Sequence, residues 1–117
     1  MDVGHKTFRL KVGAHKLKVR HVSSVRMDEI YKAFSGGDDE HECLGACCFQ
    51  ADGHEIIIDR SLSGSRYVGT VFHEIIELLN NLYDLELAHC QVSTLGEALT
   101  QVLGDNRRQV QSLIDEI

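Results

Sequence analysis

Residues 64–84 predict one long amphipathic helix, and this helix constrains the fold of the whole chain. At about 100° per residue, its large apolar side chains fall in one broad arc and its polar side chains lie opposite. The arc consists of Val68, Val71, Phe72, Ile75, Leu78, Leu79 and Leu82. A helix with such a face gains most of its stability by packing against other apolar surface. We therefore expect the remaining elements to pack around it.

The polar side of this helix carries a candidate metal site. His73 and Glu77 are four residues apart, so both can hold one metal ion from the same side of the helix, and Glu74 lies at the border between the two faces. The spacing is that of the zinc-peptidase motif His-Glu-x-x-His, with glutamate in place of the second histidine. Asn80, one turn further on, is a candidate to orient one of the metal ligands by a hydrogen bond.

A catalytic zinc ion usually has three protein ligands and one open position, so a third ligand is needed. The candidates on the next predicted helix are His89 and Glu97, with water as a further possibility. His89 lies about 90° from the centre of that helix's apolar stripe, whereas Glu97 lies nearly opposite the stripe, toward solvent. The preferred set is therefore His73, Glu77 and His89. Glu74 would then act as the general base on a metal-activated water.

The rest of the chain predicts a single α+β domain with a small antiparallel or mixed sheet. Alternating apolar residues predict a hairpin within 1–35, followed by a short helix, and a strand pair within 43–60. Gly45 in the first strand of that pair marks either a bulge or a close approach of another backbone. A second helix over 88–104 and a tail over 107–117 follow the long helix. The apolar stripe of this second helix is expected to pack on the same core, and it comprises Ala88, Val92, Leu95, Leu99, Val102 and Leu103.

Composition narrows the functional classes. The chain has 117 residues, 43% of them hydrophobic, and a formal net charge of −6, which suits one domain and argues against a nucleic-acid-binding surface. No apolar run reaches the length of a membrane span, and the first residues lack the apolar core of a signal peptide. We expect a cytoplasmic protein with no membrane partner. The acidic stretch 38–42 is expected to be a solvated loop.

The four cysteines predict buried or half-buried free thiols rather than disulfides, since nothing indicates export. Cys47 and Cys48 are adjacent, and on a strand their side chains would point to opposite faces, which is awkward for a shared metal site. A structural metal site built from the cysteines is a weaker alternative.

The segment from Leu44 through Asn106 resembles the small zincin-like metallopeptidases encoded by phages and prophages. The resemblance depends on four strings, which are Ile56-Ile-Ile-Asp59, Thr70-Val-Phe-His-Glu-Ile-Ile-Glu77, Leu85-Glu-Leu-x-His89 and Leu99-Thr-Gln-Val-Leu-Gly-Asp-Asn106. It implies a zincin-like fold with a small sheet and an active-site helix. In that family His73 matches the first ligand, Glu74 the base and Glu77 the second ligand, whereas His89 matches a polar position where a third ligand is plausible.

Two functions follow as hypotheses. The first is a peptidase that binds one zinc ion and hydrolyses a peptide or protein substrate, in the host cytoplasm if a phage encodes the chain. The alternative is a catalytically inactive zincin-like module, of phage or prophage origin, with a binding or regulatory role.

Overall fold

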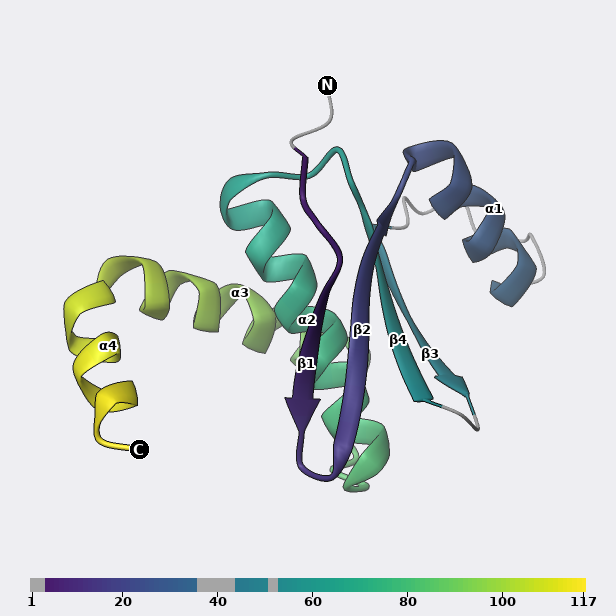
Figure 1. The fold of residues 1–117 in the computed structure, drawn as a ribbon. Helices are drawn as coiled ribbons and strands as arrows, with labels where there is room; N and C mark the ends of the chain where they lie inside the picture. The colour runs from purple at the N-terminus through teal and green to yellow at the C-terminus, as the bar shows by residue number, and fades with distance from the viewer. Residues whose placement is uncertain (1–3, 36–43, 51–52) are drawn as a thin grey trace.

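The computed structural model describes residues 4–35, 44–50 and 53–117, which form an α+β fold. In chain order the elements are β1 (Phe8–Val12), β2 (His15–Val22), α1 (Ser24–Ser35), β3 (Gly45–Gln50), β4 (Gly53–Asp59), α2 (Gly64–Leu82), α3 (His89–Asp105) and α4 (Arg107–Asp115). Figure 1 shows the strands side by side, with α2 running along the sheet. The long helix and the N-terminal hairpin are where the sequence predicts them.

The sheet is mixed, with strand order β1-β2-β4-β3. β1 and β2 form the expected antiparallel hairpin, and β3 pairs antiparallel with β4, as predicted. The sequence left open how the two pairs join. In the structure β2 and β4 lie parallel, with Val19 opposite Ile56 and His21 opposite Ile58, so β4 is a central strand.

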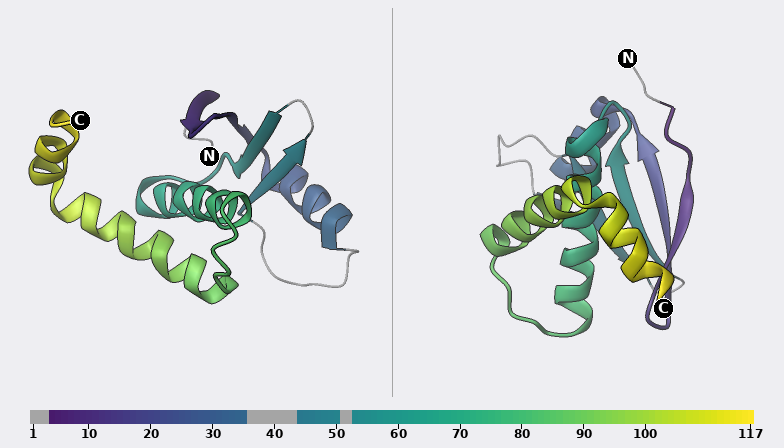
Figure 2. Two further views of the ribbon diagram at one scale, coloured as in Figure 1. Left: turned by 90° about the horizontal axis from the view of Figure 1, so that it is seen from below. Right: turned by 90° about the vertical axis from the view of Figure 1, so that its left-hand side faces the viewer.

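Burial on both faces of β4 explains its continuous isoleucine run. Ile56 and Ile58 are fully buried in a cluster with Leu17 and Leu78, on the face that α2 covers. Ile57 points the other way and packs with Val22 and Met27, where α1 begins. The sheet is thus sandwiched between α2 and α1, as the two views of Figure 2 indicate.

Helix α3 packs across α2, but not in the predicted manner. Val92 is buried, whereas Leu95, Leu99 and Val102 remain 42%, 40% and 52% exposed, so the expectation that the whole stripe joins the core is wrong. The contact with α2 is made through Gly96, whose missing Cβ lets the two backbones approach closely. Both helices deviate from their predicted bounds by one or two residues, and the predicted tail contains α4.

Some sequence expectations fall outside the described residues, namely those on the acidic stretch 38–42, on Cys43 and on the turn at Asp52. Cys90 is a free thiol, as expected, but it is exposed, whereas the sequence predicted buried or half-buried thiols. Within the described parts of the chain, no helix combines the length and apolarity that crossing a bilayer requires.

Asp59 connects the end of β4 to the start of α1 through hydrogen bonds of its side chain. Its buried carboxylate accepts hydrogen bonds from the Ser24 hydroxyl at 2.8 and 3.0 Å, from the Ser61 backbone N–H at 2.9 Å and from the Ser61 hydroxyl at 2.8 Å. Burial alone would raise the pKa of Asp59, but these donors, together with Arg66, hold it below its usual value. The charged form is therefore favoured by the fold.

We expect Asp59→Asn to lower the free energy of unfolding by about 1–3 kcal/mol at neutral pH, because the buried side chain loses the charge that strengthens its hydrogen bonds from Ser24 and Ser61. Since the folded pKa is depressed, the contribution of Asp59 is present above pH ~4 and disappears as the pH falls below that value. Urea unfolding at a series of pH values measures both effects. The matched control is Asp28→Asn at an exposed position of α1, which should change neither. Equal stability of the Asp59 variant and the wild type at pH 7 would contradict this role.

Candidate metal centre

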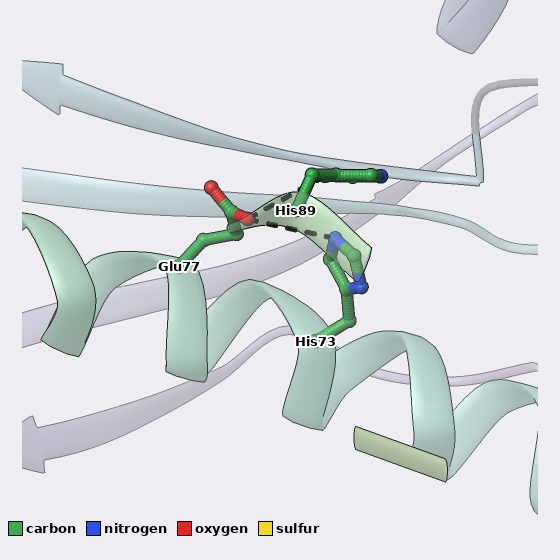
Figure 3. Close-up of side chains that lie close together, drawn as sticks. All are labelled: His73, Glu77 and His89. Carbon is green, nitrogen blue, oxygen red and sulfur yellow. Dashed lines mark ion pairs between the residues drawn. The ribbon is translucent and has the colours of Figure 1, made fainter. Parts of the chain in front are cut away.

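Two of the predicted ligands project from the same side of α2 (Figure 3). His73 and Glu77 are one turn apart, and His73 Nε2 lies 3.9 Å from Glu77 Oε1. Both side chains are partly exposed, at 22% and 36%. Burial lowers the pKa of His73, Glu77 raises it and His89 lowers it again, with a net decrease. The imidazole is thus biased toward the neutral form that binds metals.

His89, the first residue of α3, completes the group. Its Nδ1 lies 3.7 Å from the same Glu77 Oε1, and its ring contacts that of His73 edge-on with centroids 5.1 Å apart. One ligand atom from each residue lies within 4.8 Å of the others. Ligand atoms around a tetrahedral zinc ion are about 3.3 Å apart, so modest side-chain rotations would suffice for binding.

The loop between α2 and α3 determines where His89 lies. Asn80 binds its backbone twice, since Asn80 Nδ2 donates to the Leu87 carbonyl at 3.1 Å and Leu87 N–H donates to Asn80 Oδ1 at 3.0 Å. Asp84 and Glu86 in this loop have φ of 48° and 60°, a region that costs non-glycine residues about 1 kcal/mol or more. Asn80 therefore positions the segment that ends in His89, rather than contacting a ligand directly.

Ser93 is a site residue that the sequence analysis missed. Its hydroxyl lies 3.5 Å from His73 Nδ1, so it faces the ring nitrogen opposite the one directed at Glu77. Such a partner orients a metal-binding histidine and selects its tautomer. The sequence could have indicated Ser93, because it follows His89 by four residues and therefore lies on the same side of α3.

Glu74 lies between the helix and the sheet and is only 7% exposed. Burial, and secondarily the charge of Glu77, raise the pKa of Glu74 to about 8. The space for it comes from Gly45 at the start of β3, since a Cβ there would lie 3.1 Å from Glu74 Cγ and 3.0 Å from Thr70 Cγ2. The sequence predicted a bulge or the approach of another backbone at Gly45, whereas the atoms closest to this position belong to side chains and Gly45 pairs in regular register with Ile58. A carboxyl with a pKa near neutrality is well suited to general acid–base chemistry.

These residues line one open cleft of about 1050 Å³. His73 and Glu74 from α2, His89 and Ser93 from α3, and Gly45 from β3 all belong to its wall. Glu97 also lines the cleft and is exposed, as predicted, but it is not part of the group of three ligand atoms. Among the residues described, the structure thus brings His89 and not Glu97 to the candidate metal position.

Other histidines have structural contacts. His21 Nε2 lies 2.8 Å from the Tyr67 hydroxyl, and the His5 ring stacks on Tyr67 with centroids 3.6 Å apart. The rings of His15 and His54 lie 5.0 Å apart. These contacts agree with the structural or exposed roles expected for them, while His41 falls outside the described residues.

Comparison of the chain with protein-family models, with curated proteins and with solved structures finds no match. Any function assigned to the chain therefore depends on the geometry of this cleft and on the chemistry of the residues that line it.

Proposed function

We propose that this chain is a zinc-dependent peptidase with a zincin-like fold, which binds one zinc ion through His73, Glu77 and His89. One observation carries the proposal: three ligand atoms from two helices come within 4.8 Å of one another, and two of their residues share a cleft wall with the buried Glu74. Two imidazoles and one carboxylate are a common ligand set of catalytic zinc.

The residues of the cleft have separate roles in the proposed hydrolysis. A bound zinc ion would supply a Lewis acid for the scissile carbonyl and lower the pKa of a water molecule. Glu74 takes the proton of the attacking water and passes it to the leaving amine. Leu44 and Gly45 line the same cleft at the start of β3, which is one of the two edge strands of the sheet. An extended peptide would add alongside β3 with its scissile bond next to Glu74.

A second function is favoured by a different observation. Glu77 Oε1 lies 3.9 Å from His73 Nε2 and 3.7 Å from His89 Nδ1, so it would form an ion pair with either imidazole when that ring is protonated, and the three side chains can cluster on this basis alone. Under this alternative the chain is a catalytically inactive zincin-like module with a binding or regulatory role. It would contain no stoichiometric metal, and its stability would not respond to a chelator.

Elemental analysis of untagged protein, purified without chelator, distinguishes the two. The peptidase proposal expects about one zinc ion per chain, lost in His73→Ala because two ligands rarely hold zinc in competition with buffer. The matched control His15→Ala removes a half-buried histidine at the start of β2, outside the candidate ligand group, and should keep the metal. No zinc in the wild type, with no binding on titration, would overturn the proposal in favour of the inactive module.

A further inference from the structure

The face of β1 and β2 that is turned away from α2 carries a row of basic side chains. Leu10 and Leu17 pack against the core on the α2 side, so the alternate residues of both strands point the other way. In Figure 1 this face of the two strands is turned toward the viewer, with α2 behind them, and no described helix lies in front. Its side chains, called the basic row below, are Arg9, Lys11, Lys16, Lys18 and Arg20.

Solvation of an ordinary surface does not explain the basic row. Surface charges of both signs are usually interspersed, and like charges directly opposite each other on neighbouring strands destabilise a sheet. Lys11 nevertheless lies directly opposite Lys16, and the next pair of the row along the hairpin is also basic. Within the described strands, the acidic side chain that adjoins the row is Glu55, which lies opposite Lys18 and forms an ion pair with Arg20 at 2.8 Å. Most of the positive charge is therefore not balanced within the sheet.

Protection of an open sheet edge does not explain the row either. Lysine on an edge strand prevents unwanted pairing with other chains, and β1 is an edge strand of the described sheet. β2, however, is hydrogen-bonded to β1 on one side and to β4 on the other, and it carries three of the five basic residues. The row therefore indicates a ligand of opposite charge.

The spacing of the charges fits an extended acidic segment of a protein. Alternate residues of a strand are about 6.8 Å apart, so acidic residues at every second position of an added strand repeat at the same interval as the basic row. The open side of β1 offers backbone hydrogen-bonding groups to such a strand. On the α2 side of β1, Phe8 is 37% exposed and can contact apolar side chains on the other face of the added strand.

The same face is less suited to a single-stranded nucleic acid. Proteins that bind single strands combine basic groups with aromatic side chains on which the bases stack. The alternate positions of β1 and β2 on this face present no aromatic side chain. Charge and shape therefore favour a protein segment.

We propose that the open edge of β1 and the basic row bind an acidic segment of a partner protein, which adds to the sheet as a further strand with Asp or Glu at alternate positions. Its carboxylates lie beside Arg9 and Lys11, and the basic side chains of β2 strengthen the attraction. Opposite charges then face each other across the edge of the sheet. β1 and β3 are opposite edges, so this surface is separate from the candidate metal centre and does not depend on the proposed zinc.

Fluorescence anisotropy of a labelled peptide with alternating Glu and Val tests the proposal. The full chain should bind this peptide at low ionic strength, and Lys16→Glu should weaken binding about tenfold or more, because an attraction becomes a repulsion. The matched control Lys32→Glu makes the same change at an exposed position of α1 and should bind like the wild type. Failure of the wild type to bind, or equal binding by Lys16→Glu, would overturn the proposal.

Two further peptides separate strand addition from general attraction between charges. One has the same composition with its Glu residues in adjacent pairs, and the other keeps the alternating sequence but is methylated on its backbone nitrogens. Both should bind about tenfold more weakly or less, because the first loses the matching repeat and the second loses its hydrogen-bond donors. Equal binding of all three would reject strand addition. Tighter binding of duplex DNA or of phosphatidylserine vesicles, lost in Lys16→Glu, would assign the basic row to phosphate groups and overturn the proposal.

Stability provides an independent readout of Lys16→Glu. The midpoint of urea unfolding should rise, because Lys11 gains a partner of opposite charge. A substitution that stabilises the fold and weakens binding is expected at a functional surface. A lower midpoint would count against the proposal. Zinc content should equal that of the wild type, so failure of the acidic peptide to bind and failure of the metal site are distinguishable.

Discussion

Glu74→Gln is expected to abolish peptide hydrolysis while leaving the metal bound. The amide occupies nearly the same volume beside Gly45, so the close packing of α2 on β3 is retained. Because burial already raises the pKa of Glu74 to about 8, an uncharged side chain is tolerated at this position. The amide cannot accept the proton of the attacking water, and loss of a general base lowers kcat by about 10²–10⁴-fold. Turnover of a quenched-fluorescent peptide library, alongside zinc content, measures both properties.

The matched control makes the same chemical change three residues later. Glu77→Gln should lose the metal, because an amide oxygen is a poor substitute for a carboxylate ligand, and hydrolysis should then disappear with it. The two variants thus separate a base from a ligand on the same helix. Full activity of Glu74→Gln, or loss of its zinc, would contradict the assignment. Metal-loaded wild type that cleaves no member of the library would count against a peptidase altogether.

Local patterns in the sequence were enough to predict most of the elements and to place two of the three candidate ligand residues on one side of a helix. Apolar side chains recur at helical spacing over residues 64–84, which predicts α2. The same spacing places His73 and Glu77 on one side of that helix. The alternation around Leu17 and Val19 fixes the hairpin and the side that faces the core. These features depend on neighbours within a few residues, so the pattern contains the information needed.

The features of the fold that could not be predicted from the sequence depend on contacts between distant segments. The parallel pairing of β2 with β4 depends on how α1 and β3 lead the chain around the sheet. The stripe on α3 was expected to enter the core, yet Leu95 and Leu99 remain exposed, because α3 packs against the polar side of α2. A stripe shows that a helix has an apolar face and does not show what covers it. Among the described residues, Leu99 of α3 and Leu113 of α4 remain exposed.

His89, the third candidate ligand, shows both what local patterns can predict and what they cannot. His89 was preferred over Glu97 from its angle to a stripe whose packing turned out otherwise, and the structure nonetheless brings His89 to Glu77. The decisive features are the two hydrogen bonds of Asn80 to Leu87 and the close approach of α3 at Gly96. Neither feature produces a repeating pattern in the sequence from which it could have been predicted. The site residues remain predictions until metal binding is measured.

Gly96→Leu is expected to separate α3 from α2 and to disrupt the metal centre with it. A Cβ at Gly96 would lie 3.3 Å from the Gly69 carbonyl oxygen and 3.3 Å from the His73 backbone nitrogen. Both are backbone atoms, so no side-chain rotation relieves the contact, and overpacking of this kind costs about 1–3 kcal/mol. Displacing α3 moves His89 and Ser93 away from His73, which should weaken zinc binding at least about tenfold, as loss of supporting contacts does elsewhere.

The same helix provides the control, because a Cβ at Gly104 meets no atom within 4 Å. Gly104→Leu gains the same helix propensity, about 0.5–1 kcal/mol, without the contact. It should therefore raise the free energy of unfolding slightly and bind zinc like the wild type. Urea unfolding and zinc titration of the two variants isolate the effect of helix approach from that of glycine removal. Equal zinc affinity in both variants would mean that the ligand group does not need α3 held against His73, and the assignment of His89 as the third ligand would then fail.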